Sequence, residues 1–431
     1  MNFLIKTVNQ NYIYIKNSAW IIVEKLLSIF GLIFVTSYVA KYIGPDNFGK
    51  LSYVISIFTI IQTISMLGMD TILFRRISKN RFSGINLMMS TIKLRIILYI
   101  IVSTLFSSYF IYNTEDYITI AFTISVAISY FFLAIDHYAI YFNAVLKSKI
   151  NVYFNIIGLS LSLLLRYLIV YFKFEIIYLA IPIMLTSIIP FFLRFLYFHF
   201  IISPKKLEDK YRSKYIYHLI KTGIPISVSN VSIVIYSKIS QILLATLISN
   251  YALGIFSVAS TLAYAWLFVP QAIITSYFTK IYKMHNKNEI IISTSYLNIF
   301  ISIIGLLYLL FIYLFGDFII KILYGSEYTK ASGILFFLAI SSSISCLGTI
   351  SYRYIIAFSG YSFLAKKMIF TSIISIIITY FLVKNYSING AIIASISIEI
   401  ISLTIFNYFF KEYLVLRMHI RTLLIPFITN K

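Results

Sequence analysis

The sequence predicts an all-α integral membrane protein in which twelve transmembrane helices form two lobes of six. Three observations support this fold class. Hydrophobic residues make up 60% of the 431 positions and charged residues only 12%, which is too little charge to cover a soluble domain. The apolar residues come in runs of about 20, the length that a membrane-spanning helix needs. The Lys and Arg residues gather in alternate connecting segments, as in a chain that crosses the membrane repeatedly.

The apolar runs define the predicted spans in chain order. Their approximate ranges are 18–41, 48–73, 91–112, 117–143, 150–172, 175–202, 222–247, 252–278, 290–315, 331–357, 364–383 and 389–410. Lys6 and Lys16 precede the first run, but that run is a full span without a convincing small-residue cleavage site. We therefore expect the first helix to remain in place and to act as its own insertion signal.

The charges of the connecting segments predict the orientation. If both termini lie in the cytoplasm, most of the 36 Lys and Arg residues fall in cytoplasmic segments and few fall in outer loops. An odd number of helices would destroy this alternation. Retention of cationic loops on the cytoplasmic side also explains the formal charge of +22 without nucleic acid as a partner. Contact with membrane lipids, in particular anionic headgroups, is expected of these loops.

The longest hydrophilic segment divides the chain into two halves. The predicted parts are an N-lobe (1–202), a basic cytoplasmic linker (203–221), a C-lobe (222–410) and a basic cytoplasmic tail (411–431). The first outer loop contains FGKLS and the fourth contains LGIFS, so that Gly49 aligns with Gly254 and Ser52 with Ser257. This match predicts a parallel repeat, with two lobes related by a pseudo-two-fold axis along the membrane normal.

The seventh predicted helix carries polar residues that a lipid-facing helix would not have. Ser227, Asn230, Lys238 and Gln241 share one helical face, and a second polar stripe runs beside it. One interpretation is that this face lines a polar cavity; the alternative is polar contact between packed helices, a common use of Ser and Asn. Lys238 favours the cavity, because a lone ammonium in a membrane needs water or an anionic ligand.

Three further cations lie in or near predicted spans. Lys25, Arg166 and Arg353, together with Lys238, are candidates for contacts with an anion in such a cavity. Lys25 and Arg353 could instead extend to the membrane surface. Arg166 has no carboxylate at pairing distance in its own helix. Because low-dielectric walls focus an electric field, a cavity lined in this way would concentrate anions such as phosphate or pyrophosphate.

The acidic candidates are fewer. Asp136 and His137 form either a proton relay or a structural hydrogen-bonded pair. Glu399 lies well inside the last predicted helix and needs a partner from another helix. Glu24 is adjacent to Lys25, and adjacent residues on a helix do not face each other. These four residues are candidates for ion coupling or for structural roles.

No motif of a soluble enzyme is present. The sequence has no phosphate-binding loop of the Walker type, no HExxH and no nucleophile elbow. The single cysteine, Cys346, excludes an intrachain disulfide and argues against a cysteine metal site. We therefore expect no catalytic residues, no metal and no cofactor, and a process driven by an ion or substrate gradient.

The chain resembles the polysaccharide and O-antigen flippases (the Wzx type) of the multidrug/oligosaccharidyl-lipid/polysaccharide exporter superfamily. The resemblance covers nearly the whole chain. The residues that carry it are NSAWIIVEKLLSIFGLIFVTSYVAKYIGPDNFGKLSYVISIF, GMDTILFRRISKN, IYSKISQILLATLISNYALGIFSVASTL and LYGSEYTKASGILFFLAI. One departure concerns Ser240, where many relatives carry an aspartate that is a candidate for ion coupling.

The resemblance implies a fold and a function. The two lobes would form a V around a central cavity, with cationic residues holding a pyrophosphate or acidic sugars. Alternating access would move an undecaprenyl-pyrophosphate-linked oligosaccharide, of the O-antigen, lipopolysaccharide or capsule type, from the cytoplasmic to the periplasmic leaflet. The protein would lie in the bacterial inner membrane, and a polysaccharide polymerase and a chain-length regulator would be further partners.

Three alternatives remain open at this point. A multidrug/cation antiporter of the same fold should have an acidic cavity, whereas this one leans basic. A membrane-embedded polysaccharide polymerase or glycosyltransferase usually presents a large outer loop, and the longest outer segment here, 316–330, is short. A purely structural scaffold would not explain the unpaired cations within the spans.

Overall fold

The computed structural model of the chain describes residues 2–202, 212–282 and 284–428. These residues form helices and no strands, which confirms the predicted all-α class. Ten described segments are long and apolar enough to cross a membrane. Two of the ten contain a backbone break, at Gly44 and at Ser387, and each break separates two of the predicted spans. With these two divisions, each of the twelve predicted spans has a helical counterpart in this multi-pass membrane protein.

The chain forms two compact units. Unit 1 consists of Met1–Ile43 and Val54–Val234, and unit 2 of Gly44–Tyr53 and Ile235–Lys431. A short piece of the N-terminal region therefore belongs to unit 2. Residues 203–211 of the predicted linker lie outside the described residues. The predicted limits of lobes, linker and tail remain a prediction.

Unit 1 contains the helices of the N-terminal half of the chain. They are α1 (Asn2–Met66), α2 (Met69–Lys79), α3 (Arg81–Tyr112), α4 (Tyr117–Ile135), α5 (His137–Ala144), α6 (Ser148–Tyr171), η1 (Ile176–Leu179), α7 (Ala180–Tyr197), η2 (Phe198–Ile202) and the first part of α8 (Arg212–Leu247). The α7 helix packs against α4 and α6, and α2 packs against α3 and α5. Their shared apolar core includes Met69, Leu73, Tyr138 and Phe198.

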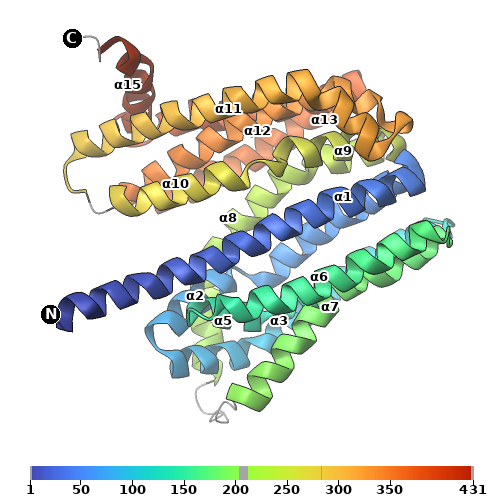
Figure 1. Cartoon of the computed structure of the whole chain (residues 1–431), viewed down its shortest axis with the longest axis horizontal. Helices are drawn as coiled ribbons and strands as arrows, with labels where there is room; N and C mark the ends of the chain where they lie inside the picture. The colour runs from blue at the N-terminus through green and yellow to red at the C-terminus, as the bar shows by residue number, and fades with distance from the viewer. Residues whose placement is uncertain (1, 203–211, 283, 429–431) are drawn as a thin grey trace. The chain divides into compact units, whose positions relative to one another are not determined.

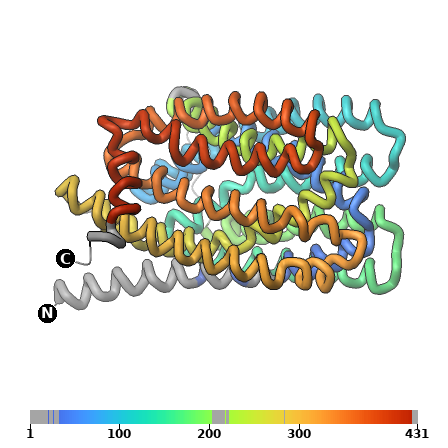
Figure 2. Tube along the Cα trace, turned by 90° about the horizontal axis from the view of Figure 1, so that it is seen from above, coloured from blue at the N-terminus to red at the C-terminus, as the bar shows by residue number. Residues whose placement is uncertain are grey.

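Unit 2 contains the rest of α8 and the helices that follow. They are α9 (Asn250–Ala265), α10 (Phe268–Ile281), α11 (Lys287–Tyr324), η4 (Ser326–Tyr328), α12 (Lys330–Ala357), α13 (Tyr361–Leu403), α14 (Ile405–Tyr408) and α15 (Leu414–Ile428). The long helices α11 and α12 run side by side (Figures 1 and 2), and α12 also packs against α9 and α13. The short α15 crosses one end of α11 (Figure 1), and its Val415 and Met418 complete an apolar core there.

Two glycines allow a very close helix crossing in unit 2. A Cβ atom added to Gly49 would lie 1.8 Å from the carbonyl oxygen of Asn250, and one added to Gly254 would lie 1.9 Å from the carbonyl oxygen of Pro45. These are the two glycines that the internal repeat aligns. Gly44 precedes this segment with φ 74°, a conformation that glycine adopts without strain. The crossing therefore depends on glycine at both positions.

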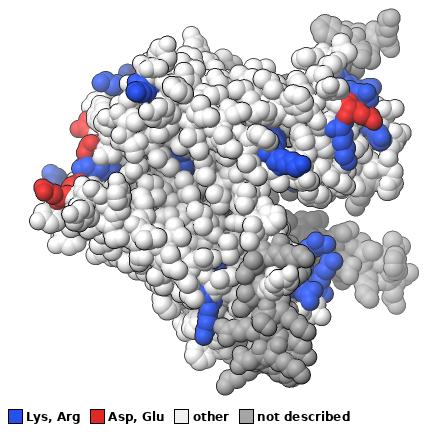
Figure 3. Space-filling view, turned by 180° about the vertical axis from the view of Figure 1, so that it is seen from behind, with Lys and Arg blue, Asp and Glu red and all other residues white. Residues whose placement is uncertain are grey.

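The surface is largely uncharged. Figure 3 shows one face on which Lys and Arg gather in small groups, with Asp and Glu beside some of them, while uncharged side chains cover most of the described surface in that view. Large apolar side chains are exposed along the spans, among them Leu105 on α3 and Leu306 on α11, at 68% and 65%. Such continuous apolar exposure is expected of helices that face lipid.

Candidate functional site

A polar pocket of about 370 Å³ lies inside unit 2, between α8, α9, α12 and α13. It is lined by Tyr236, Ser237, Lys238, Ser240, Gln241, Phe256, Ser260, Thr261, Tyr264, Leu338, Ser345, Ser395, Ile398 and Glu399. Most of these side chains carry a hydroxyl, an amide or a charge. A pocket of this size and polarity can hold a polar ligand group.

Helical periodicity explains why these residues meet at the pocket. On α8, Lys238 and Gln241 are three residues apart, and on α9, Ser260 and Tyr264 are four apart. Residues at these spacings lie on one face of a helix. The sequence predicts that Ser227, Asn230, Lys238 and Gln241 share one face of the seventh span. Of these four residues, Lys238 and Gln241 line this pocket, whereas Ser227 and Asn230 do not. Ser227 is buried and Asn230 is exposed, and both precede the unit boundary at residue 234.

The ammonium of Lys238 is available to a ligand. Its Nζ donates one hydrogen bond to Gln241 Oε1 at 3.1 Å. No carboxylate among the described residues forms a salt bridge with it. An ammonium has three donors, so this neutral contact leaves hydrogen-bonding capacity unused. Together with the surrounding hydroxyls, Lys238 suits a phosphate or another anionic oxygen group.

Glu399 provides the negative charge of the same pocket. It lies on the second half of α13, opposite Tyr236 of α8 and Tyr264 of α9, both of which interact with its charge. Its cationic neighbour is Lys367, which comes from the first half of α13 and is only 6% exposed. The pocket region therefore holds two ammonium groups and one carboxylate.

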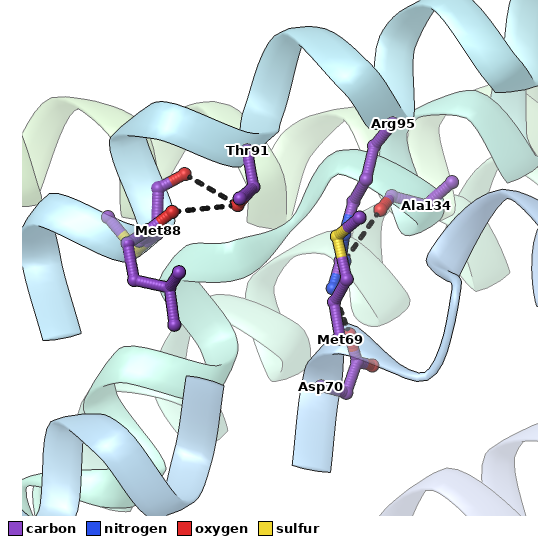
Figure 4. A network of polar contacts seen from close by, with 7 residues as sticks. Met69, Asp70, Met88, Thr91, Arg95 and Ala134 are labelled. Atoms are coloured by element: carbon purple, nitrogen blue, oxygen red, sulfur yellow. Dashed lines mark hydrogen bonds and ion pairs between the residues drawn. The ribbon is translucent and has the colours of Figure 1, made fainter. Parts of the chain in front are cut away.

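Unit 1 contains a buried arginine held by three neighbours. Arg95 of α3 is 1% exposed. Its guanidinium donates to Asp70 Oδ1 at 2.6 Å, to the carbonyl oxygen of Ala134 at 3.1 Å and to the sulfur of Met69 at 3.2 Å, as Figure 4 shows. The Ala134 carbonyl belongs to the last turn of α4, where the helical hydrogen-bond ladder stops. Arg95 thus satisfies a backbone group that the helix end leaves free.

A second buried ion pair lies at the break between α4, which ends at Ile135, and α5, which begins at His137. Asp136 caps α5, accepting a hydrogen bond from the Ala139 N–H at 3.2 Å, and it pairs with Arg194 of α7. Arg194 also donates to Asn155 of α6 at 2.6 Å. A hydrogen-bonded Asp136–His137 pair, one of the two predicted alternatives, is therefore wrong. His137 is 1% exposed, and its ring nitrogens have no hydrogen-bond partner among the described residues.

The remaining predicted cations lie apart from the pocket. Arg166 of α6 is half-buried in unit 1 and forms no hydrogen bond or salt bridge with the described residues. Arg353 of α12 donates to the Thr275 hydroxyl at 2.9 Å, outside the pocket. The side chains of Glu24 and Lys25 lie outside the described part of the structure. Their roles remain predictions.

The family of the chain follows from a sequence comparison. A family described as polysaccharide biosynthesis protein matches residues 14–266, which is more than half of the chain. The chain belongs to this family. Among curated protein sequences, none matches this chain significantly.

Solved structures of similar fold identify the architecture of the chain. An inward-facing multidrug resistance MATE family transporter of the MOP superfamily is 14% identical, with 93% of this chain and 98% of that chain covered and a TM-score of 0.67. The lipid II flippase MurJ in an inward closed conformation is 16% identical, with 96% and 92% covered and a TM-score of 0.68. A MOP superfamily transporter from Pyrococcus furiosus, for which a binding pocket of reverse polarity is described, is 14% identical, with 95% and 96% covered and a TM-score of 0.56. The fold is therefore that of MOP superfamily transporters.

Several residues of the pocket region are not predicted by the sequence. Tyr264, Ser345 and Ser395 line the pocket, but hydroxyl residues are frequent in all the spans and give no local signal. Lys367, near the start of the predicted span 364–383, was not among the candidate cations, but it is the seventh residue of α13 and is buried beside Glu399. The signal that could have identified it is its place at the start of an apolar run.

Proposed function

We propose that this protein is a flippase that moves an undecaprenyl-pyrophosphate-linked oligosaccharide, of the O-antigen or capsule type, from the cytoplasmic to the periplasmic leaflet. The observation that carries the proposal is the unit 2 pocket, in which Lys238 has no anionic partner among the described residues. The family concerns polysaccharide biosynthesis, and a pyrophosphate is the charged group that joins a carrier lipid to a sugar. The MurJ neighbour acts on a lipid-linked substrate, lipid II.

Most of the predicted residues have a role in this proposal. Lys238 donates to the pyrophosphate, and Gln241 orients the ammonium through its side-chain carbonyl. Arg166, Lys25 and Arg353 are further anion contacts, and Ser227 and Asn230 are polar residues along the substrate path. Asp136 and Arg194 keep α5 in place at the helix break. Glu24 remains a candidate for coupling.

The mechanism that we propose is alternating access by two rigid lobes. The N-lobe (1–202) and the C-lobe (222–410) would move against each other about the basic linker (203–221), with the tail (411–431) in the cytoplasm. The protein would lie in the bacterial inner membrane with both termini in the cytoplasm, as the loop charges predict. A polysaccharide polymerase and a chain-length regulator would act on the flipped product.

A multidrug/cation antiporter is the second candidate. The MATE neighbour has this fold, and Glu399 provides one carboxylate for a cation. Against it, Lys238 lines the same pocket, and an ammonium there repels a cationic drug because charges of like sign interact strongly where water is scarce. The flippase is therefore the function that the pocket supports better.

The test is complementation in a host whose own flippase gene is deleted and whose cognate repeat unit is supplied. Wild type should restore surface polysaccharide. Lys238→Ala should reach the membrane but leave the lipid-linked repeat unflipped in the cytoplasmic leaflet, and Arg166→Ala should be impaired in the same way. Lys287→Ala, at the exposed start of α11, is the matched control and should behave as wild type.

The opposite results would discriminate between the candidates. If wild type fails with its cognate repeat, the flippase assignment is wrong. If repeat units reach the periplasm without the protein and fail only to polymerise, a polymerase role replaces it. If wild type instead confers resistance to cationic drugs and Glu399→Gln abolishes it, the antiporter is correct.

A further inference from the structure

Lys367 is a buried cation without a close ion pair. It lies in the first half of α13 and is 6% exposed. Its ammonium forms no salt bridge with the carboxylates that the structure describes. Removal of an ammonium from water is unfavourable unless an opposite charge or a polar ligand compensates for it. The proposed function leaves this buried charge without a role.

Glu399 is the carboxylate that compensates for the charge of Lys367. It lies in the second half of α13, beyond the backbone break at Ser387, and its charge interacts with that of Lys367. Exposed carboxylates are screened by water and salt. The other carboxylates of unit 2 in the described part of the chain are all exposed, namely Asp46, Glu289, Asp317, Glu327 and Glu412. The buried ammonium therefore depends on Glu399.

The lining of the pocket contains one charge of each sign. Among the described residues that line it, Lys238 is the only cation and Glu399 the only carboxylate. If these two charges acted alone, they would cancel, and Lys238 would have little attraction left for an anion. Glu399 interacts instead with Lys367, and Lys238 donates to the neutral side chain of Gln241. The capacity of Lys238 to bind an anion therefore depends on a second cation outside the lining.

We propose that Lys367 is a positioning residue that neutralises Glu399 and so leaves Lys238 free to bind an anion. The inference rests on the proposed function. Two ammonium groups and one carboxylate give the pocket region a net positive charge, which favours a pyrophosphate over a cationic ligand. Without Lys367 the net charge is zero, and Glu399 becomes available to pair with Lys238. A residue outside the lining thus determines whether the pocket prefers an anion.

The experiment measures anion binding to the full chain in lipid nanodiscs by calorimetry. The probe is a short-chain prenyl pyrophosphoryl N-acetylglucosamine, which carries one negative charge on each phosphate and no group that titrates near neutral pH. Lys367→Met keeps the apolar part of the side chain and removes its charge. This variant should bind the probe about tenfold more weakly than wild type, since a unit charge acts strongly where water is scarce. Lys366→Met is the matched control and should bind as wild type does, because Lys366 is the preceding residue on α13 but is exposed.

A double-mutant cycle tests whether Lys367 acts through Glu399. Glu399→Gln alone should bind the probe only about threefold more tightly, because a carboxylate that is already neutralised repels an anion weakly. Lys367→Met combined with Glu399→Gln should return to wild-type affinity, since no carboxylate is left to oppose Lys238. Lys367→Arg keeps the charge and should bind within about twofold of wild type. The double variant removes both buried charges, so it keeps the test valid even where Lys367→Met alone does not fold.

The outcomes separate this inference from the proposed function. If wild type does not bind the probe, the pocket is no pyrophosphate site, and the inference and the support for the flippase are lost together. If wild type binds and the double variant stays about tenfold weaker, Lys367 contacts the ligand itself and only the inference is wrong. If Lys367→Met binds as wild type does but unfolds at a lower temperature, Lys367 has a structural role alone, and the flippase stands without the inference.

Discussion

Two arginines in unit 1 are almost completely buried, and each has a carboxylate partner. Arg95 is 1% exposed and Arg194 is 4% exposed. Their partners are Asp70 of α2 and Asp136, which lies between α4 and α5. Burial of an unpaired charge is very unfavourable, so the folded state depends on each pair staying intact. The two pairs lie on either side of the break between α4 and α5, because Arg95 binds the Ala134 carbonyl and Asp136 caps α5.

Removal of one partner of the Arg194–Asp136 pair, in which both side chains are buried, should destabilise the protein strongly. We expect Arg194→Ala to lower the free energy of unfolding by about 3–5 kcal/mol, since it leaves Asp136 buried without its cation. Asp136→Asn combined with Arg194→Met should recover part of this loss, because Asn keeps the helix cap without a charge. Unfolding in mixed micelles, followed by circular dichroism, measures the effect.

The control for this experiment is Lys321→Ala. It breaks the exposed pair of Lys321 and Asp317 on α11, in which both side chains are 56% exposed. An exposed pair contributes little, so this variant should unfold as wild type does. Equal effects of Arg194→Ala and Lys321→Ala would contradict the role of burial.

His419 makes the packing of α15 dependent on pH. Its ring nitrogens lie 3.2 Å from the hydroxyl of Ser351 and 3.2 Å from that of Tyr408. Burial lowers the pKa of His419 from 6.5 to about 4. The folded state therefore favours neutral His419, and between these two values the unfolded chain binds more protons. Stability is fully present above the unfolded pKa and is lost as the pH falls toward 4.

The test is the stability of α15 across this pH window. Wild type should lose stability on the order of 3 kcal/mol by the acid end, which hydrogen exchange of the α15 amides would show as faster exchange. His419→Gln has no titrating ring and should lack this part of the pH dependence. Identical pH profiles for the two proteins would show that His419 has no such effect.

At the scale of elements, the closest helix approach is the crossing at Gly49 and Gly254. The atoms that a new Cβ would meet belong to the backbone at Asn250 and Pro45, so no side-chain rotation can relieve the overlap. The internal repeat in the sequence aligned these two glycines, and the structure places them in direct contact. A shared requirement for the absence of a side chain explains why both halves of the repeat carry glycine here.

Substitution of either glycine should disrupt this crossing. We expect Gly49→Ala and Gly254→Ala each to reduce stability by several kcal/mol or to prevent folding, since helix shifts of this size cost more than ordinary overpacking, about 1–3 kcal/mol. Gly333→Ala on α12 is the control, because a Cβ there meets no atom within 4 Å. The yield of monodisperse protein in detergent and its unfolding temperature measure the difference. Normal behaviour of Gly254→Ala would show that the crossing is looser than described.

For the whole molecule, loop charge predicts the orientation in the membrane. Single cysteines can test this, because the chain has only Cys346, which is buried, and Cys346→Ser provides a background without reactive thiols. We expect a cysteine at exposed Glu115, in the loop between α3 and α4, to react with an impermeant reagent added outside intact spheroplasts. A cysteine at exposed Lys287 should react only after permeabilisation. The reverse pattern would invert the topology.

The sequence by itself determined the properties that depend on local pattern. Hydropathy and run length were enough for the membrane class and the twelve spans, because each span is long and apolar on its own. The polar face with Lys238 and Gln241 was also predictable, since helical periodicity relates residues three or four apart. The match of Gly49 with Gly254 was visible for the same reason, as two short segments can be compared without a fold.

Only the tertiary structure decided which helices share a site. Lys238 and Glu399 come from α8 and α13 and meet at one pocket, while Ser227 and Asn230, on the predicted face with Lys238, do not line it. Asp136 pairs with Arg194 of α7 and not with its neighbour His137. Hydrogen bonds and charge pairs between distant helices depend on how those helices pack. A single sequence contains no signal for such pairing, because hydroxyl and charged residues of the same kind occur in many spans.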